Sequence, residues 1–147
     1  MQLLVLQVDE KKRILMKLGE IGKYIEELEE ILPTEEDYNH NLTIRRACEK
    51  TIELALEALI SIISLIVARE RLGFPEDEDN LITLLQKKQL LSTKMCITLK
   101  AMKGFRNILV HKYGEIDNEQ AYEFLSNNLE DFNLFEREVK KYLGTKK

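Results

Sequence analysis

The sequence is poor in the residues that form turns and in those that bind metals. Its 147 residues include two prolines, six glycines, two cysteines, two histidines and no tryptophan. So little Pro and Gly disfavours a chain rich in turns, and the abundant Leu, Ile, Glu and Lys are typical of amphipathic helices. Two Cys and two His so far apart in sequence predict no metal site.

The two cysteines also make a disulfide framework improbable. Cys48 and Cys96 have no CxxC partner, and both fall inside helical patterns. We expect free, buried thiols in a reducing compartment, with a disulfide between the two as the alternative.

Long apolar runs are scarce as well. The opening MQLLVLQV is short, lacks a basic leader and is followed by Asp9, Glu10 and Lys11, unlike a secretory signal. The longest apolar stretch, 58–68, is about half of what spans a bilayer. We therefore expect a cytoplasmic protein with no membrane segment.

Acidic residues are missing from one segment. The net charge is −4, which argues against general attraction to nucleic acid, but residues 80–114 contain seven basic residues and no Asp or Glu. All 26 acidic residues and 15 of the 22 basic ones lie elsewhere. Such segregation can create a positive face for a phosphate chain. The alternative is that these lysines point to solvent on different sides.

The apolar pattern predicts helices throughout. Apolar residues recur at helical spacing from Ile14 to Leu32, and Pro33 ends this stripe. Thr34 with three following acids is a helix-start signal, Ser92 or Thr93 is another, and Asp117 with Gln120 forms a capping box. The expected helices are 8–32, about 42–71, 80–89, 92–114 and 117–143. We predict an all-α fold over a single domain, residues 1–147, as an antiparallel bundle of four main helices plus a short helix.

One segment, 105–114, combines unusual side chains near a helix end. Arg106 and Tyr113 are two turns apart and share a face, whereas His111 is roughly 140° from Arg106 on an ideal helix. His111 reaches the same place only if the helix end unwinds, which Gly114 favours. Taken alone, a His at this position more often caps the helix.

These side chains suit the cleavage of RNA. RNA carries its own nucleophile, the 2′-hydroxyl, so a ribonuclease needs proton transfer and charge stabilisation. A histidine can act as general base or acid. An arginine can hold two phosphate oxygens in a more negative transition state. This chemistry requires no metal and no cofactor.

The pattern Arg106-x4-His111-x-Tyr113, with Asn107 directly after the arginine, resembles the R-x4–6-H-x-Y motif of HEPN toxins of the HepT type. These toxins are encoded beside a minimal nucleotidyltransferase antitoxin of the MNT type. The resemblance runs from the first helix to about Leu143. It includes Arg46-Ala47-Cys48-Glu49, Glu57-Ala58 and the Gly73-x-Pro75 loop.

The resemblance implies an HEPN-type bundle and an activity. Arg106 and His111 would be the catalytic pair of a metal-independent endoribonuclease that acts on tRNA or mRNA and leaves a 2′,3′-cyclic phosphate. Asn107 would orient this pair, and the antitoxin would transfer AMP to Tyr113 and silence the toxin. Family members form homodimers in which both motifs face one cleft.

The basic residues nearest this motif are candidates for binding RNA: Lys103, Lys112 and, from the long helix, Arg46. For Arg46 and Lys50, ion pairs with Glu49 or Glu53 on the helix surface are an equally good prediction. We expect His40 to be exposed without a function, and the acidic run 76–79 to be solvated surface.

Two other functions remain open at the level of sequence. The scaffold could bind a nucleotide or RNA without cutting it, as a helical dimer that acts as partner subunit of a nucleotidyltransferase. The motif could also be no more than a capped helix end.

Overall fold

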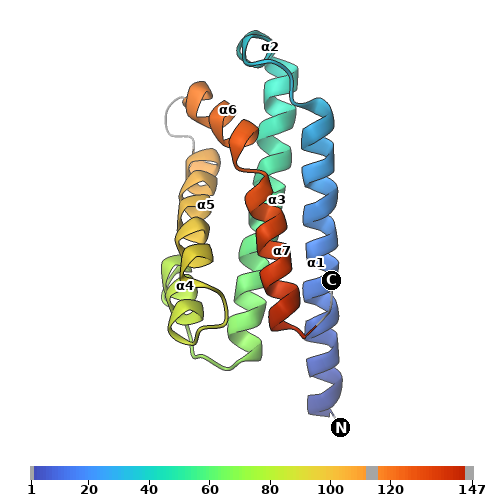
Figure 1. The fold of residues 1–147 in the computed structure, drawn as a ribbon, viewed down its shortest axis with the longest axis vertical. Helices are drawn as coiled ribbons and strands as arrows, with labels where there is room; N and C mark the ends of the chain where they lie inside the picture. The colour runs from blue at the N-terminus through green and yellow to red at the C-terminus, as the bar shows by residue number, and fades with distance from the viewer. Residues whose placement is uncertain (1, 112–115, 145–147) are drawn as a thin grey trace.

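The computed structural model describes residues 2–111 and 116–144, with side chains from residue 10 to 110 and from 116 to 144. Within these residues the chain forms helices and no strand, as predicted (Figure 1). The seven helices are α1 (Gln2–Ile31), α2 (Glu35–His40), α3 (Leu42–Arg69), α4 (Glu78–Lys87), α5 (Thr93–His111), α6 (Asn118–Asn127) and α7 (Glu130–Tyr142).

Helices begin at the residues that the sequence predicted as helix starts. The Thr34 hydroxyl accepts a hydrogen bond from the backbone of Asp37, and the Asp117 carboxylate accepts two from the first turn of α6. The Ser92 hydroxyl accepts one from the backbone of Met95. Each cap satisfies amide groups that have no partner inside the helix.

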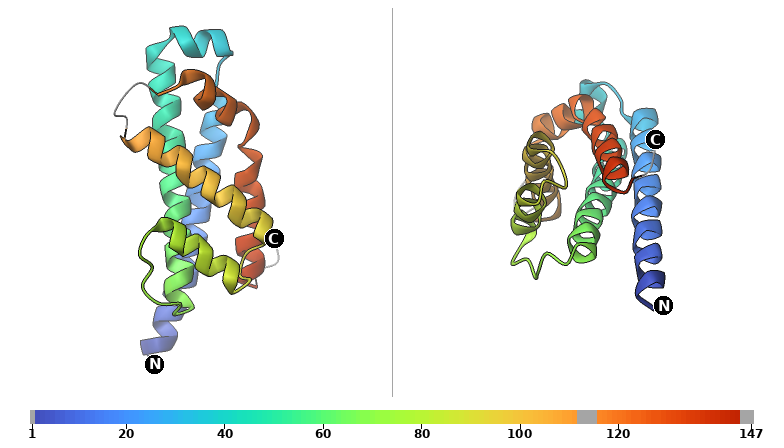
Figure 2. Two further views of the ribbon diagram at one scale, coloured as in Figure 1. Left: turned by 90° about the vertical axis from the view of Figure 1, so that its left-hand side faces the viewer. Right: turned by 60° about the horizontal axis from the view of Figure 1, so that its bottom comes forward.

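The core lies between α1 and α3, which run side by side along the long axis of the molecule (Figure 1). The stripe predicted on the first helix is buried, and it packs against an almost continuous aliphatic face of α3. Each fully buried Leu or Ile contributes about 1.5–3 kcal/mol through removal from water. Helices α4 and α5 cover a second side of α3, and α5 crosses α3 at an angle (Figure 2).

Helix α3 is apolar over a longer span than the stretch 58–68. By length and composition it could cross a membrane, and half of its most apolar window is buried inside the bundle. Its contacts with α1, α4 and α5 explain the composition, because a helix covered on several sides is apolar around its circumference.

The final helix differs from the prediction of one continuous helix over 117–143. The chain bends at Asn128, whose φ is −114° and ψ 3°, and this separates α6 from α7. Helix α6 contacts α2, whereas α7 contacts α1 and α5, so a straight helix could not reach both sets of partners. Asn127 and Asn128 weaken the helix at that point, since asparagine side chains compete for backbone hydrogen bonds.

Candidate active site

The motif lies at the C-terminal end of α5. Arg106 and Asn107 are in its last two turns, and His111 is its final residue. The side chain of His111 and the whole of Lys112, Tyr113 and Gly114 lie outside the described residues. The predicted unwinding of the helix end, and the meeting of the imidazole and phenol with Arg106, therefore stay predictions.

Helix α5 is held in place at both ends. At its start, Glu138 of α7 accepts hydrogen bonds from the backbone N and the hydroxyl of Ser92, at 2.8 and 2.7 Å. Near its end, the Phe105 ring stacks on the Phe124 ring with centroids 4.2 Å apart and planes 11° from parallel. The stack is adjacent to Arg106, so the backbone that carries the arginine is fixed.

Arg106 forms an ion pair that sequence reasoning missed. Its Nη2 donates to Oε2 of Glu78, in the first turn of α4, and its Nε is buried without an acceptor among the described residues. The Arg106 side chain is 15% exposed and that of Glu78 is 34% exposed. The carboxylate is therefore the more exposed partner of the pair.

A second ion pair lies one helical turn along α5. Lys103 Nζ is 3.0 Å from Asp79 Oδ1, and the lysine is again the more covered partner, 18% exposed against 54%. The expectation that residues 76–79 are only solvated surface is therefore wrong for Glu78 and Asp79. Both acids are in the first turn of α4, and no local feature of the sequence distinguishes them from the other acids of the run.

The basic residues that the structure describes in the segment 80–114 fall into two groups, those paired with acids and those exposed to solvent. Lys103 and Arg106 are matched by carboxylates from α4, whereas four lysines are exposed, namely Lys87, Lys88, Lys94 and Lys100. A carboxylate beside each of these two partly buried cations neutralises that part of the predicted positive face.

The basic residues at the start of α3 are engaged in local contacts. Arg46 Nη1 is 2.9 Å from Oε1 of Glu49, a carboxylate that is only 3% exposed, and Lys50 pairs with Glu53 at 3.8 Å. Arg45 donates to the carbonyl groups of Tyr38 and Asn39, both at 2.9 Å. The ion-pair alternative for Arg46 and Lys50 is confirmed.

His40 is exposed, as predicted. It lies at the end of α2, and its Nδ1 is 2.8 Å from the Glu36 carbonyl oxygen. A histidine that closes a short surface helix in this way needs no further role.

Both cysteines are free and buried, which confirms the prediction. Burial, followed by the nearby carboxylate of Glu49, raises the pKa of Cys48 to about 11. Burial also raises the pKa of Cys96. Neither thiol is a nucleophile near neutral pH, because the reactive species is the thiolate. Among the described side chains no group of three His, Cys, Asp or Glu residues could hold a metal ion.

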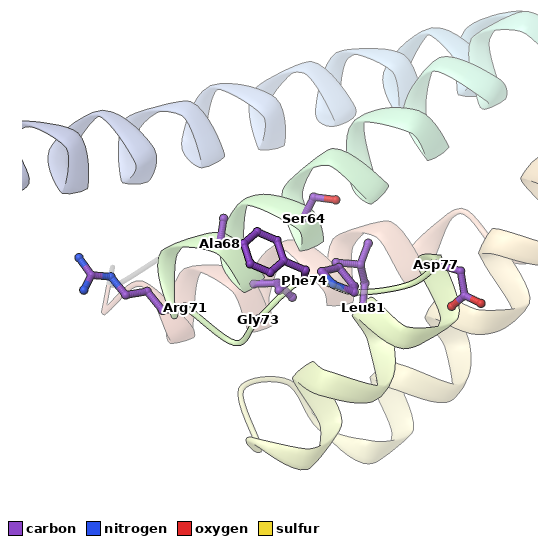
Figure 3. Close-up of a pocket in the computed structure, with 9 residues that line it drawn as sticks. Ser64, Ala68, Arg71, Gly73, Phe74, Asp77 and Leu81 are labelled. Atoms are coloured by element: carbon purple, nitrogen blue, oxygen red, sulfur yellow. The ribbon is translucent and has the colours of Figure 1, made fainter.

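An apolar cavity of about 650 Å³ lies at the loop that joins α3 to α4, and its lining includes Asp77, the residue before Glu78. Figure 3 shows Arg71 and Asp77 at opposite ends of it, with Phe74 between them. Its walls come from the end of α3, the loop and Leu81. With only two charged side chains, so far apart, this cavity does not provide a set of converging catalytic groups.

The outward face of α5 is apolar. Ile97 is 65% exposed and Ile108 48% exposed. Ala101 and Gly104 lie between them at helical spacing, and a Cβ added at Gly104 would meet open space. This face leads directly to His111 at the helix end.

Comparison with known proteins identifies relatives along most of the chain. A family model described as ribonuclease HepT-like matches residues 21–139, a range that contains the motif. An mRNA nuclease HepT from Shewanella oneidensis is 27% identical over 122 residues, which cover 83% of this chain and 92% of the relative. A tRNA nuclease HepT from Aphanizomenon flos-aquae is 27% identical over 130 residues, which cover 88% of each chain.

Solved structures share the fold. A tri-AMPylated HEPN toxin of Shewanella oneidensis, in complex with an MNT antitoxin, superposes with a TM-score of 0.81 at 26% identity and covers 88% of this chain and 97% of that chain. A toxin–antitoxin structure with AMP-PNP gives a TM-score of 0.82 at 25% identity and covers 88% of this chain and 98% of that one. These similarities confirm the predicted HEPN-type helical bundle.

Proposed function

The chain belongs to the HepT-like ribonuclease family, and on this basis we propose that it is a metal-independent endoribonuclease toxin, with residues 1–147 forming a single HEPN domain. The observation that carries the proposal is the family match over 21–139, which includes Arg106 and His111 at the end of a fixed helix. Relatives named as mRNA and tRNA nucleases support it.

The proposed reaction uses the RNA's own hydroxyl group. His111 takes the proton of the 2′-hydroxyl, whose oxygen bonds to phosphorus while the bond from phosphorus to the 5′-oxygen breaks. The products are a 2′,3′-cyclic phosphate and a 5′-hydroxyl, which takes up a proton. Arg106 stabilises the additional negative charge on the phosphate, and Asn107 orients the pair.

The proposed RNA path follows α5. Lys103 is one turn from Arg106 and Lys112 follows His111 in the sequence, and we propose that they contact phosphates on either side of the cleaved bond. Arg46 binds Glu49, but its side chain is 58% exposed and stays a candidate for an outer contact.

We expect the active form to be a homodimer. The outward face of α5, with Ile97 and Ile108 exposed around Ala101 and Gly104, is apolar and lets another helix approach closely. Association through this face would bring two copies of the motif to one cleft. A monomer in sedimentation experiments at micromolar concentration would contradict it.

The proposed partner is an MNT-type nucleotidyltransferase that acts with the toxin in the cytoplasm. The related Shewanella toxin is tri-AMPylated in its complex with such an antitoxin. We place the AMP acceptor in this chain at Tyr113. A Tyr113→Phe protein that still gains AMP from the antitoxin and ATP, by mass spectrometry, would exclude that residue.

The test of the function is direct. Purified protein is incubated with cellular tRNA and mRNA in EDTA, and the products are mapped and their 3′ ends analysed. Cleavage with cyclic phosphate ends is expected. RNA that is bound but intact after long incubation would instead favour a non-catalytic binding subunit of the nucleotidyltransferase.

A further inference from the structure

The proposed catalytic arginine is covered by a carboxylate from another helix. Glu78 lies in the first turn of α4, which Asp77 caps, and it accepts a hydrogen bond from Arg106 Nη2. Asp79 covers Lys103 in the same way one turn earlier on α5. In both pairs the acid is the more exposed partner, so it lies on the outer side of the cation.

A carboxylate and an RNA phosphate compete for the same donors. Arginine binds both through N–H···O hydrogen bonds to oxygens of similar size and charge. A phosphate that approaches Arg106 from solvent therefore meets the carboxylate of Glu78 first. It must either displace this side chain or accept a second negative charge within contact distance.

We propose that Glu78, with Asp79 in a lesser role, is an internal mimic of the RNA phosphate that occupies Arg106 until RNA displaces it. Glu78 thereby sets the affinity of the site for RNA. The proposal rests on the function proposed for Arg106. Removal of the carboxylate should therefore tighten RNA binding. If Glu78 only positioned Arg106, the same change would weaken binding or turnover.

The experiment compares Glu78→Gln with Glu76→Gln. Glutamine keeps an acceptor oxygen for Arg106 but has no charge. Glu76 is an exposed acid two residues away that forms no ion pair with α5 among the described residues, so its variant has the same charge change without the contact. Both changes are made in His111→Ala protein, which is expected to leave the RNA intact.

Binding of a short fluorescein-labelled oligouridine is measured by fluorescence anisotropy over a range of KCl concentrations. For Glu78→Gln we expect roughly two- to fivefold tighter binding, the fold-change that corresponds to a partly exposed ion pair. The slope of log K against log salt should steepen by about 0.7, since the variant has no displaced carboxylate to offset the charge with which Arg106 neutralises a phosphate on a single strand. Glu76→Gln should have the same slope of log K against log salt as the His111→Ala protein without it.

Weaker binding, or an affinity and slope equal to those of Glu76→Gln, would overturn the proposal. If circular dichroism shows that Glu78→Gln has lost helical structure, RNA binding of Asp79→Asn is measured instead. A smaller increase in affinity is expected for this variant. With His111 intact, Glu78→Gln should lower KM by about the factor by which it tightens binding. Absence of cleavage by every variant would contradict the proposed function, while the binding data would still decide the role of Glu78.

Discussion

Two arginines of this protein are paired with glutamates in opposite arrangements. At the start of α3, the guanidinium of Arg46 is on the outside and the carboxylate of Glu49 is inside. Between α4 and α5, the guanidinium of Arg106 is inside and the carboxylate of Glu78 is outside. In the first pair an exposed cation neutralises a buried acid, and in the second a more exposed acid covers a partly buried cation.

We interpret the first pair as structural and the second as part of the proposed site. Glu49 is buried near Tyr38 and Cys48, and a buried carboxylate needs a partner such as Arg46. Arg106 is 15% exposed and its Nε is buried, so its charge is also compensated by a carboxylate, but here the acid lies between the cation and solvent. We therefore relate this pair to the proposed site, where a phosphate can replace the carboxylate.

Substitution of the two arginines should affect different properties. Arg106→Ala should lower RNA cleavage by at least about 100-fold, since it removes the charge that stabilises the transition state. Arg46→Ala, which removes only an outer RNA contact, should lower kcat/KM by no more than about two- to fivefold. Steady-state kinetics with one RNA substrate checks both, and equal losses in the two variants would contradict the distinction.

The stability of the two variants should show the reverse order. Arg46→Ala leaves Glu49 buried and unpaired, which should cost about 1–3 kcal/mol of the free energy of unfolding in urea. Lys50→Ala, which breaks an exposed pair on the same helix, is the control and should cost less than about 1 kcal/mol. An Arg46→Ala protein as stable as the control would mean that Glu49 is satisfied in another way.

The burial of Cys48 beside Glu49 should also make the free energy of unfolding depend on pH in the alkaline range. The pKa of Cys48 is about 11 in the folded protein and 9.0 ordinarily, so from pH 9 upward the unfolded chain loses the thiol proton first. The free energy of unfolding should therefore fall as pH rises from 9 towards 11, by up to about 1.4 kcal/mol per pH unit for this thiol. Cys48→Ala should have a shallower slope in urea unfolding, and an identical slope would exclude Cys48 as the cause.

The sequence was sufficient for the parts of the fold that depend on local rules. Periodicity and caps predicted the buried stripe of α1 and the helix starts at Thr34, Ser92 and Asp117. The bend at Asn128 was missed, because it follows from the different partners of α6 and α7, which no local pattern records.

The same limit applies to the candidate site. Arg106 and His111 are neighbours on one helix, so their spacing could be read from the sequence. Glu78 is 28 residues from Arg106 and reaches it only because α4 folds back along α5. Its local context, a run of acids in a loop and a first helical turn, is that of ordinary solvated surface.

The most direct test of the account is one comparison of purified wild-type and His111→Ala proteins on the same RNA in EDTA. We expect cleavage to cyclic phosphate ends by the wild type and at least about 100-fold less by His111→Ala at unchanged helical content. Full nuclease activity of the His111→Ala protein, free of contaminating ribonuclease, would contradict the central claim.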